Sequence, residues 1–284
     1  MSEKAIRSRR RRDPLSVFLR VIVYLAALIT VGVFLALVGY ILIKGVPNLS
    51  LDLFQLKYTS DNCSMLPAIF NTIFMTLLSL VVAVPLGIFS AIYLTEYAKR
   101  GNKLVKVVRL TTETLQGIPS IVYGLFGYLF FLVQLKWGYS LLAGAMTLAI
   151  MILPLIMRTT EEAMLSVPDG YREGSFALGA GRLRTIFRIV LPTAIPGILA
   201  GVILAIGRIV GETAALIYTA GTYAQTADSL FSPVRTLSVH MYVLSSEGLH
   251  IDQAYATAAV LLIVVVGINA LSAAVAKSIV KRRG

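Results

Sequence analysis

The sequence predicts an all-α integral membrane protein with six transmembrane helices. The 284 residues are 57% hydrophobic and only 14% charged, and the mean hydropathy of +0.81 is typical of a membrane protein rather than a soluble one. Six apolar runs are each long enough to cross a bilayer. These runs cover Val21–Ile43, Leu66–Leu94, Ile118–Leu135, Tyr139–Met157, Val190–Tyr218 and Tyr255–Ala276.

The distribution of positive charge orients these spans. Of the 26 Lys and Arg residues, 21 fall on the side that holds both termini: seven before the first span, five between the second and third, five between the fourth and fifth, and four at the end. Four lie on the other side, and Arg208 lies inside a span. By the positive-inside rule both termini are cytoplasmic. The net charge of +12 therefore reflects topology beside membrane lipid, and we expect no nucleic-acid partner.

The first apolar run is predicted to remain in the protein as span one. It is too long for the apolar core of a signal peptide and lacks a small-residue cleavage site. Residues 1–65 are then a basic cytoplasmic tail, the first transmembrane helix and an external loop. This loop holds Cys63, the only cysteine, which excludes an internal disulfide. Residues 66–284 are expected to form a core of five further helices.

Spans two to four carry the usual marks of membrane helices that pack against each other. Pro85 and Pro154 predict kinks whose freed carbonyls neighbouring helices must satisfy. Arg158 ends span four at helical spacing from Glu161 and Glu162, which favours an arginine anchored at the membrane boundary with a surface partner. A place on a substrate pathway is the alternative for Arg158.

Span five combines close-packing glycines with charge. Gly197–Gly201 and Gly207–Gly211 are two small-xxx-small pairs, which bring helix backbones together. Arg208 and Glu212 lie four residues apart and are expected on one helix face. An arginine at mid-span costs about 2.5–3.5 kcal/mol to insert, so we interpret Arg208 and Glu212 as substrate-pathway residues. A self-neutralised pair that only fixes packing is the alternative.

Several kinds of chemistry are missing from the sequence. It contains no phosphate-binding P-loop and no nucleophile motif, so we expect no catalytic residue and no ATP hydrolysis by this chain. His240 and His250 lie ten residues apart without a cluster of cysteine or carboxylate residues at metal-binding spacing, so no metal site is expected. Any energy for transport must come from a separate chain.

The segment between spans four and five, residues 161–192, holds a charged loop that cannot lie in lipid. Pro168 suits the first position of a helix, and Gly179 and Gly181 supply the positive φ and small size of a sharp bend. A second basic helix, Arg182–Val190, then runs directly into span five. We call the residues from Pro168 to Pro192 the 168–192 loop. Its sequence predicts a bent pair of short cytoplasmic helices shaped to bind a partner.

The 168–192 loop resembles the signature of ATP-binding-cassette importer permeases. That signature is Glu-Ala-Ala, three residues, glycine, nine residues and Ile-x-Leu-Pro. Here Glu173-Gly174-Ser175 begins the pattern, Gly179 is the glycine and Ile189–Pro192 ends it; Gly174 and Ser175 replace the two alanines. The resemblance implies a coupling helix that sits in a cleft of an ATPase, with Glu173 facing the ATPase and Gly179 forming the bend.

Two further stretches, Gly117–Gly124 and Gly211–Ala220, look like the phosphate-specific branch of these permeases, and the second is more similar to its A-type subunit. This implies a heterodimer with a sister permease, two copies of an ATPase that uses the ATP, and an external phosphate-binding protein, in a bacterial or archaeal plasma membrane. The chain itself would bind no cofactor. Alternatives are a permease for another oxyanion, such as sulfate or molybdate, and a secondary transporter or channel without an ATPase.

Overall fold

The computed structural model describes residues 14–99 and 101–281, and within these ranges the regular structure is entirely helical. The basic N-terminal residues, Arg100 and the last three residues lie outside the described ranges. The α-helices are α1 (Pro14–Gly45), α2 (Leu66–Ile92), α3 (Lys103–Gln116), α4 (Ser120–Gly127), α5 (Leu141–Leu165), α6 (Asp169–Ala177), α7 (Arg182–Thr185), α8 (Leu191–Val210), α9 (Ala214–Thr219), α10 (Leu237–Glu247) and α11 (Ile251–Lys281).

Three π-helical segments extend these helices. Tyr93–Tyr97 continues α2, Tyr128–Gln134 continues α4, and Ile186–Val190 joins α7 to α8. In the described part of the chain, five helices are long and apolar enough to cross a membrane. They are Leu15–Asn48, Leu66–Tyr97, Leu141–Leu165, Arg182–Val210 and Ile251–Ala274. Five of the six predicted spans are therefore found as long helices.

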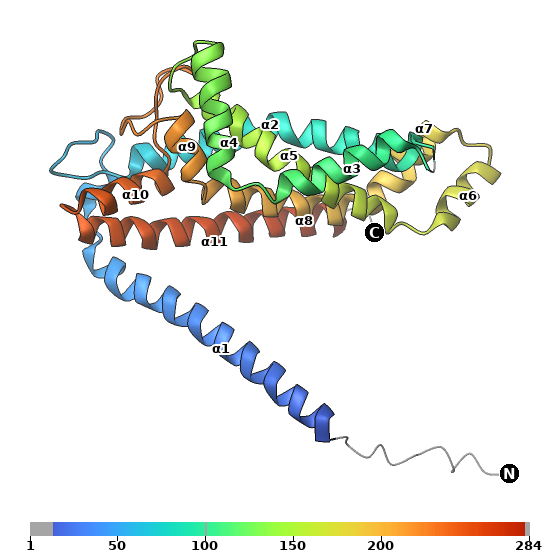
Figure 1. Ribbon diagram of the computed structural model, residues 1–284, viewed down its shortest axis with the longest axis horizontal. Coiled ribbons are helices and arrows are strands. Elements are labelled where there is room, and N and C mark those ends of the chain that lie inside the picture. Colours follow the sequence, from blue (N-terminus) through green and yellow to red (C-terminus); the bar gives the residue numbers. More distant parts are fainter. Residues whose placement is uncertain (1–13, 100, 282–284) are drawn as a thin grey trace.

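The third predicted span has a different form. The helices Lys103–Gln116 and Ser120–Gln134 are bent by 103° at the break between them, and they make a sixth span if the pair is counted as one. Pro119 and Gly117 occupy that break, where proline disfavours helical geometry in the residue before it. Figure 1 shows α3 running along the bundle and α4 standing steeply across it, where α4 packs against α9 and α5. The stretch predicted to be a cytoplasmic connector thus includes a helix of the span.

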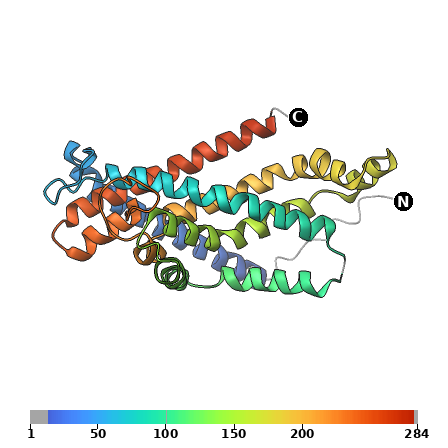
Figure 2. The same cartoon turned by 90° about the horizontal axis from the view of Figure 1, so that it is seen from above.

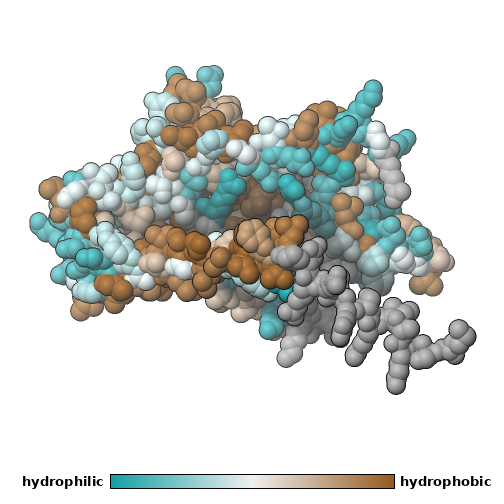
Figure 3. Space-filling model, turned by 60° about the horizontal axis from the view of Figure 1, so that its bottom comes forward, coloured by the Kyte–Doolittle hydropathy of each residue, from teal (hydrophilic) through white to brown (hydrophobic). Residues whose placement is uncertain are grey.

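The core of the bundle lies between α2, α5 and α8, which run side by side (Figures 1 and 2). Fully buried side chains from these helices include Met75, Leu148, Ile152 and Ile209. Helix α11 packs along α8, whereas α1 leaves the bundle and its most apolar window has no buried residue. Figure 3 shows apolar side chains gathered in a band along one face, as expected of a protein surrounded by lipid.

Asn71 of α2 joins the two loops at the end of the bundle far from α6. Its Nδ2 donates to the carbonyl oxygens of Gln225 at 2.9 Å and Arg235 at 3.2 Å, and its Oδ1 accepts from the Ala227 N–H at 3.1 Å. The Gln225 amide in turn donates to the Tyr58 carbonyl at 3.2 Å. Asn71 and Gln225 therefore tie the loop before α2 and the loop before α10 to this end of the bundle.

Candidate functional site

The bend of the 168–192 loop is built by Gly179. Helix α6 ends in a Schellman motif, in which the N–H of Gly179 donates to the Phe176 carbonyl at 2.9 Å and that of Ala180 to the Ser175 carbonyl at 3.1 Å. Gly179 has φ +80°, as the sequence predicts, but Gly181 has φ −73°, so only one of the two glycines is left-handed. A Cβ atom on Gly179 would meet nothing within 4 Å, so its requirement is conformational rather than steric.

The outward face of α6 is exposed and partly apolar. Glu173 is exposed, Leu178 is 90% exposed at the tip of the loop, and Tyr171 is also exposed. Single exposed apolar residues are common, but three exposed side chains on one protruding helix and its bend make a surface suited to a partner. Glu173 is accessible on this surface, and its contact with an ATPase stays a prediction.

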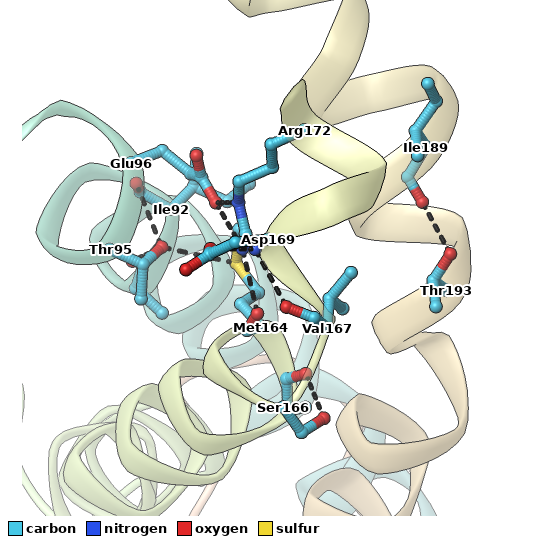
Figure 4. Close-up of polar contacts among 12 residues, drawn as sticks. Ile92, Thr95, Glu96, Met164, Ser166, Val167, Asp169, Arg172, Ile189 and Thr193 are labelled. Carbon is cyan, nitrogen blue, oxygen red and sulfur yellow. Dashed lines mark hydrogen bonds and ion pairs between the residues drawn. The ribbon is translucent and has the colours of Figure 1, made fainter. Parts of the chain in front are cut away.

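The inward face of α6 is fixed by Arg172, which the sequence did not single out. Its guanidinium reaches Glu96 at the end of α2 and the last carbonyls of α5 (Figure 4). Across the bend, the hydroxyl groups of Ser175 in α6 and Thr185 in α7 form a buried hydrogen bond with 2.8 Å between their oxygens. The predicted second helix of the loop is confirmed, with α7 continuing through the π segment into α8 as one helical rod.

A cleft of about 940 Å³ lies beside this attachment. It is lined from three sides by the end of α2, the start of α3 and the inner face of α6. Arg172 and Arg182 line it together with Lys106, and the Arg182 guanidinium lies 5.4 Å from the centre of the Tyr97 ring. The loop is therefore attached to the bundle on one side only, with open space next to the attachment.

The expected pairing of Arg208 with Glu212 on one helix face is wrong. Helix α8 ends at Val210 with Gly211 as its C-cap, so Glu212 lies beyond the helix. The Glu212 carboxylate is 9% exposed and its Oε1 accepts from the Ala215 N–H at 3.1 Å, which caps α9. Glycine ends the helix before the fourth residue can complete the turn, and the free N–H groups of α9 offer the carboxylate a better partner.

Arg208 itself is half-buried in the last turn of α8. Within the described residues no carboxylate forms a salt bridge with it. On the neighbouring helix α11, the Asn269 side chain lies close to Gly207: a Cβ atom built on Gly207 would be 3.9 Å from Asn269 Oδ1. That Oδ1 is buried without a hydrogen-bond partner among the described residues. Asn269 is a candidate missed from the sequence, although an amide inside an apolar span is a visible signal.

Arg158 has the surface partner that the sequence favours. Its Nε donates to Glu162 Oε1 at 2.9 Å, and both side chains are about half exposed. Glu161 does not join them; it binds Arg109 of α3, with 2.6 Å between Nη2 and Oε1. The ion pair of Glu161 therefore fastens α3 to α5, and Arg158 remains on the exposed side of α5.

These features define a class of protein: an all-helical membrane subunit that presents a bent helix pair for a partner. Among the described residues no group of three or more His, Cys, Asp or Glu side chains could hold a metal ion. Residues 83–284 match the family described as the binding-protein-dependent transport system inner membrane component. The chain belongs to this family, and it is a multi-pass inner membrane permease subunit of an ATP-binding-cassette importer rather than the subunit that hydrolyses ATP.

Curated relatives and solved structures agree with this family. The chain is 39% identical to the phosphate transport system permease protein PstA of Pasteurella multocida, covering 70% of this chain and 71% of that one. It is 35% identical to a probable permease protein, YqgI, of Bacillus subtilis, covering 79% and 81%. A bacterial transporter that imports the acidic polysaccharide alginate shares the fold, with a TM-score of 0.67, 19% identity, and 90% and 95% of the two chains covered.

Proposed function

We propose that this chain is the A-type permease subunit of a phosphate importer. It pairs with a sister permease, two copies of an ATPase that bind and hydrolyse ATP, and an external phosphate-binding protein, and it binds no cofactor itself. Relatives at 34–39% identity that are named as phosphate permeases support this cargo. The name of a relative at 35% identity states no cargo, so the assignment of phosphate as the cargo is also argued from the chemistry of the site.

The observation that carries the proposal is Arg208, a half-buried arginine in a membrane helix with no salt bridge to a described carboxylate. Phosphate has between one and two negative charges near neutral pH, and crossing an apolar bundle requires a compensating cation. The guanidinium stays charged and its planar fork of donors matches an oxyanion. Glu212 contributes by capping α9, which fixes the turn that follows Arg208. Asn269 adds a buried polar oxygen nearby that has no hydrogen-bond partner among the described residues.

The unpartnered surfaces of the chain fit the proposed subunits. Helix α1 leaves the bundle, and α4 packs on α9 and α5 through one side. Both keep apolar side chains exposed, among them Leu28 at 71% and, in the segment that continues α4, Leu129 at 62%. We assign the α4 surface to the sister permease and most of α1 to lipid and that subunit. The exposed Glu173 and Leu178 face the ATPase, which makes the end that carries α6 cytoplasmic.

Uptake and ATP hydrolysis by the reconstituted complex test the proposal. Wild-type complex is expected to import phosphate and to hydrolyse ATP faster when the phosphate-loaded binding protein is added. Arg208→Gln should assemble normally but lose phosphate uptake, and Arg208→Lys should be impaired because a point charge lacks the fork of donors. Losing one charged hydrogen bond to the moving anion costs about 1.5–3 kcal/mol, or about 10- to 150-fold in rate.

Arg20→Gln is the matched control, because Arg20 lies exposed on α1, away from the bundle. It should transport as wild type does. Normal phosphate uptake by Arg208→Gln would contradict the pathway role. Stimulation by sulfate- or molybdate-loaded binding protein, with no response to phosphate, would instead identify a permease for another oxyanion.

A further inference from the structure

Arg172 of α6 uses every N–H donor of its guanidinium. Its Nε donates to Glu96 Oε1 at 3.1 Å, and its Nη2 donates to the same oxygen at 2.8 Å and to the Met164 carbonyl at 3.0 Å. Its Nη1 donates to the Val167 carbonyl at 2.8 Å and to Asp169 Oδ1 at 3.2 Å. A guanidinium has five such donors, so this side chain is fully satisfied in one geometry.

The acceptors belong to three different elements. Glu96 lies in the π-helical segment that continues α2, Met164 is in the last turn of α5 with Val167 just after it, and Asp169 is in α6 itself (Figure 4). π-helical turns occur often at functional sites. Arg172 thus joins the loop that faces the ATPase to two membrane helices that are distant from it in the sequence.

Among the ion pairs of the described residues, the pair of Arg172 with Glu96 is the most buried. The side chains of Arg172 and Glu96 are 15% and 9% exposed, whereas those of Arg158 and Glu162 are 48% and 62% exposed. Water and salt weaken an exposed pair but act much less on a buried one. The remaining partner, Asp169, is 75% exposed and only one turn away, so it adds no link between elements.

An apolar cluster joins the ends of α2 and α5 to the segment that leads into α8. Ile92 of α2, Met164 of α5, Val167 just after α5, and Ile186 and Val190 after α7 belong to this buried cluster. The Thr95 hydroxyl also points to the Met164 sulfur at 3.6 Å. A packed cluster of this kind resists deformation, so the helix ends that Arg172 contacts are held firmly to the segment that leads into α8.

We propose that Arg172 is the positioning residue through which movement of α6 is transmitted to α2 and α5. This inference rests on the proposed function, because it assumes that an ATPase moves α6. The neighbouring residues Glu173 and Arg172 then have different roles. Glu173 faces outward to the ATPase, and Arg172 faces inward to the membrane helices. Lysine cannot replace Arg172, since an ammonium lacks the planar fork that reaches three elements at once.

The first test is the number of phosphate ions transported per ATP hydrolysed by the complete complex in liposomes. In Arg172→Gln and Arg172→Lys, the ATPase is expected to remain bound and active while this ratio falls. The expected fall lies between about 5- and 150-fold, the usual range of coupling between sites. Glu96→Gln should lower the ratio less, because an amide oxygen still accepts a hydrogen bond, and adding it to Arg172→Gln should cause no further fall.

Asp169→Asn is the matched control, because it alters the exposed contact of the same guanidinium and leaves the links to α2 and α5 in place. It should keep the wild-type ratio. If Arg172→Gln only lowers the thermal stability of the complex and the ratio is unchanged, the proposal is wrong. Loss of the ATPase from the Arg172→Gln complex would also overturn it, since Arg172 would then act in docking.

A second test needs no cargo and so separates this inference from the assignment of phosphate. A cysteine is placed at Phe70, which is 38% exposed near the start of α2, and its reaction rate with a thiol reagent is measured with and without ATP and vanadate. The rate should change in the otherwise wild-type complex and stay constant in Arg172→Gln. Equal changes in both would contradict transmission through Arg172, whereas a cargo other than phosphate would leave this result intact.

Discussion

At the residue scale, the end of the molecule far from α6 contains a buried cation and a buried histidine. The Arg235 guanidinium lies 4.5 Å from the centre of the Tyr58 ring, and Arg235 is 4% exposed. His240 is fully buried against the same tyrosine, with ring centroids 6.1 Å apart. Burial, and then the charge of Arg235, lower the pKa of His240 from 6.5 to about 3.

This histidine predicts a loss of stability in acid. The unfolded chain binds a proton near pH 6.5, whereas folded His240 stays neutral down to about pH 3, so stability falls as the pH drops below 6.5. Between pH 7 and pH 5 the loss from this group is about 2 kcal/mol. Thermal unfolding of the purified protein should show this decline, and His240→Phe, which keeps a ring beside Tyr58, should show a smaller one. Equal pH dependence in both proteins would contradict the prediction.

What the sequence predicts about single residues depends on the range of the interaction. Gly179 has the expected conformation and Arg158 the expected partner, because their signals are a local turn and an i,i+4 spacing. The Arg208–Glu212 pair was wrong because one glycine, Gly211, ends the helix between them. Arg172 was missed because its main partner, Glu96, is 76 residues away in the sequence.

At the element scale, only one of the two predicted glycine pairs in α8 brings helices together. A Cβ on Gly197 would meet the Cβ of Ala163 at 2.6 Å, and one on Gly201 would overlap the Thr159 side chain of α5. By contrast, a Cβ on Gly207 would have nothing closer than 3.9 Å. The first pair therefore seats α8 on α5, and the second leaves room beside Arg208.

This difference predicts opposite results for two matched substitutions. Gly201→Ala should push α8 away from α5 and destabilise the protein by about 1–3 kcal/mol, the usual cost of overpacking. Gly207→Ala gains the same helix propensity without the clash and should be neutral or slightly stabilising. Melting temperatures in detergent check both. Similar temperatures for the two variants would show that α5 and α8 can separate freely at Gly201.

The helices themselves follow from length and apolarity, which is why five spans were predicted as long helices. The form of the third span is not predicted, because hydropathy measures how apolar a segment is and not the direction in which it runs. A bend of 103° at Gly117–Pro119 turns the chain across the bundle, and the sequence predicts only a connector where the amphipathic α3 precedes this bend. A proline after a glycine marks such a break, but the angle is set by packing against α5 and α9.

At the scale of the whole molecule, the charge pattern and the structure point to one orientation. Figure 1 shows α6, α7 and the end of α11 toward one end of the bundle, and the loops around α10 at the other. The first end carries most of the positive charge, including Arg172, Arg182 and Lys277. We therefore propose that α6 and the C-terminus are cytoplasmic and that α10 and the loop before α2 are external.

Thiol labelling of intact cells checks this orientation, but the native cysteine cannot report it. Cys63 lies in the loop proposed to be external, but it is fully buried and burial raises the pKa of its thiol, so the wild-type protein should stay unlabelled. Asp61→Cys introduces a thiol at an exposed position of the same loop, and Ser278→Cys does so near the end of α11. An impermeant reagent should label Asp61→Cys on intact cells and Ser278→Cys only after permeabilisation. The reverse pattern would place α6 outside the cell, where no ATPase can reach it, and would overturn both the orientation and the role proposed for the 168–192 loop.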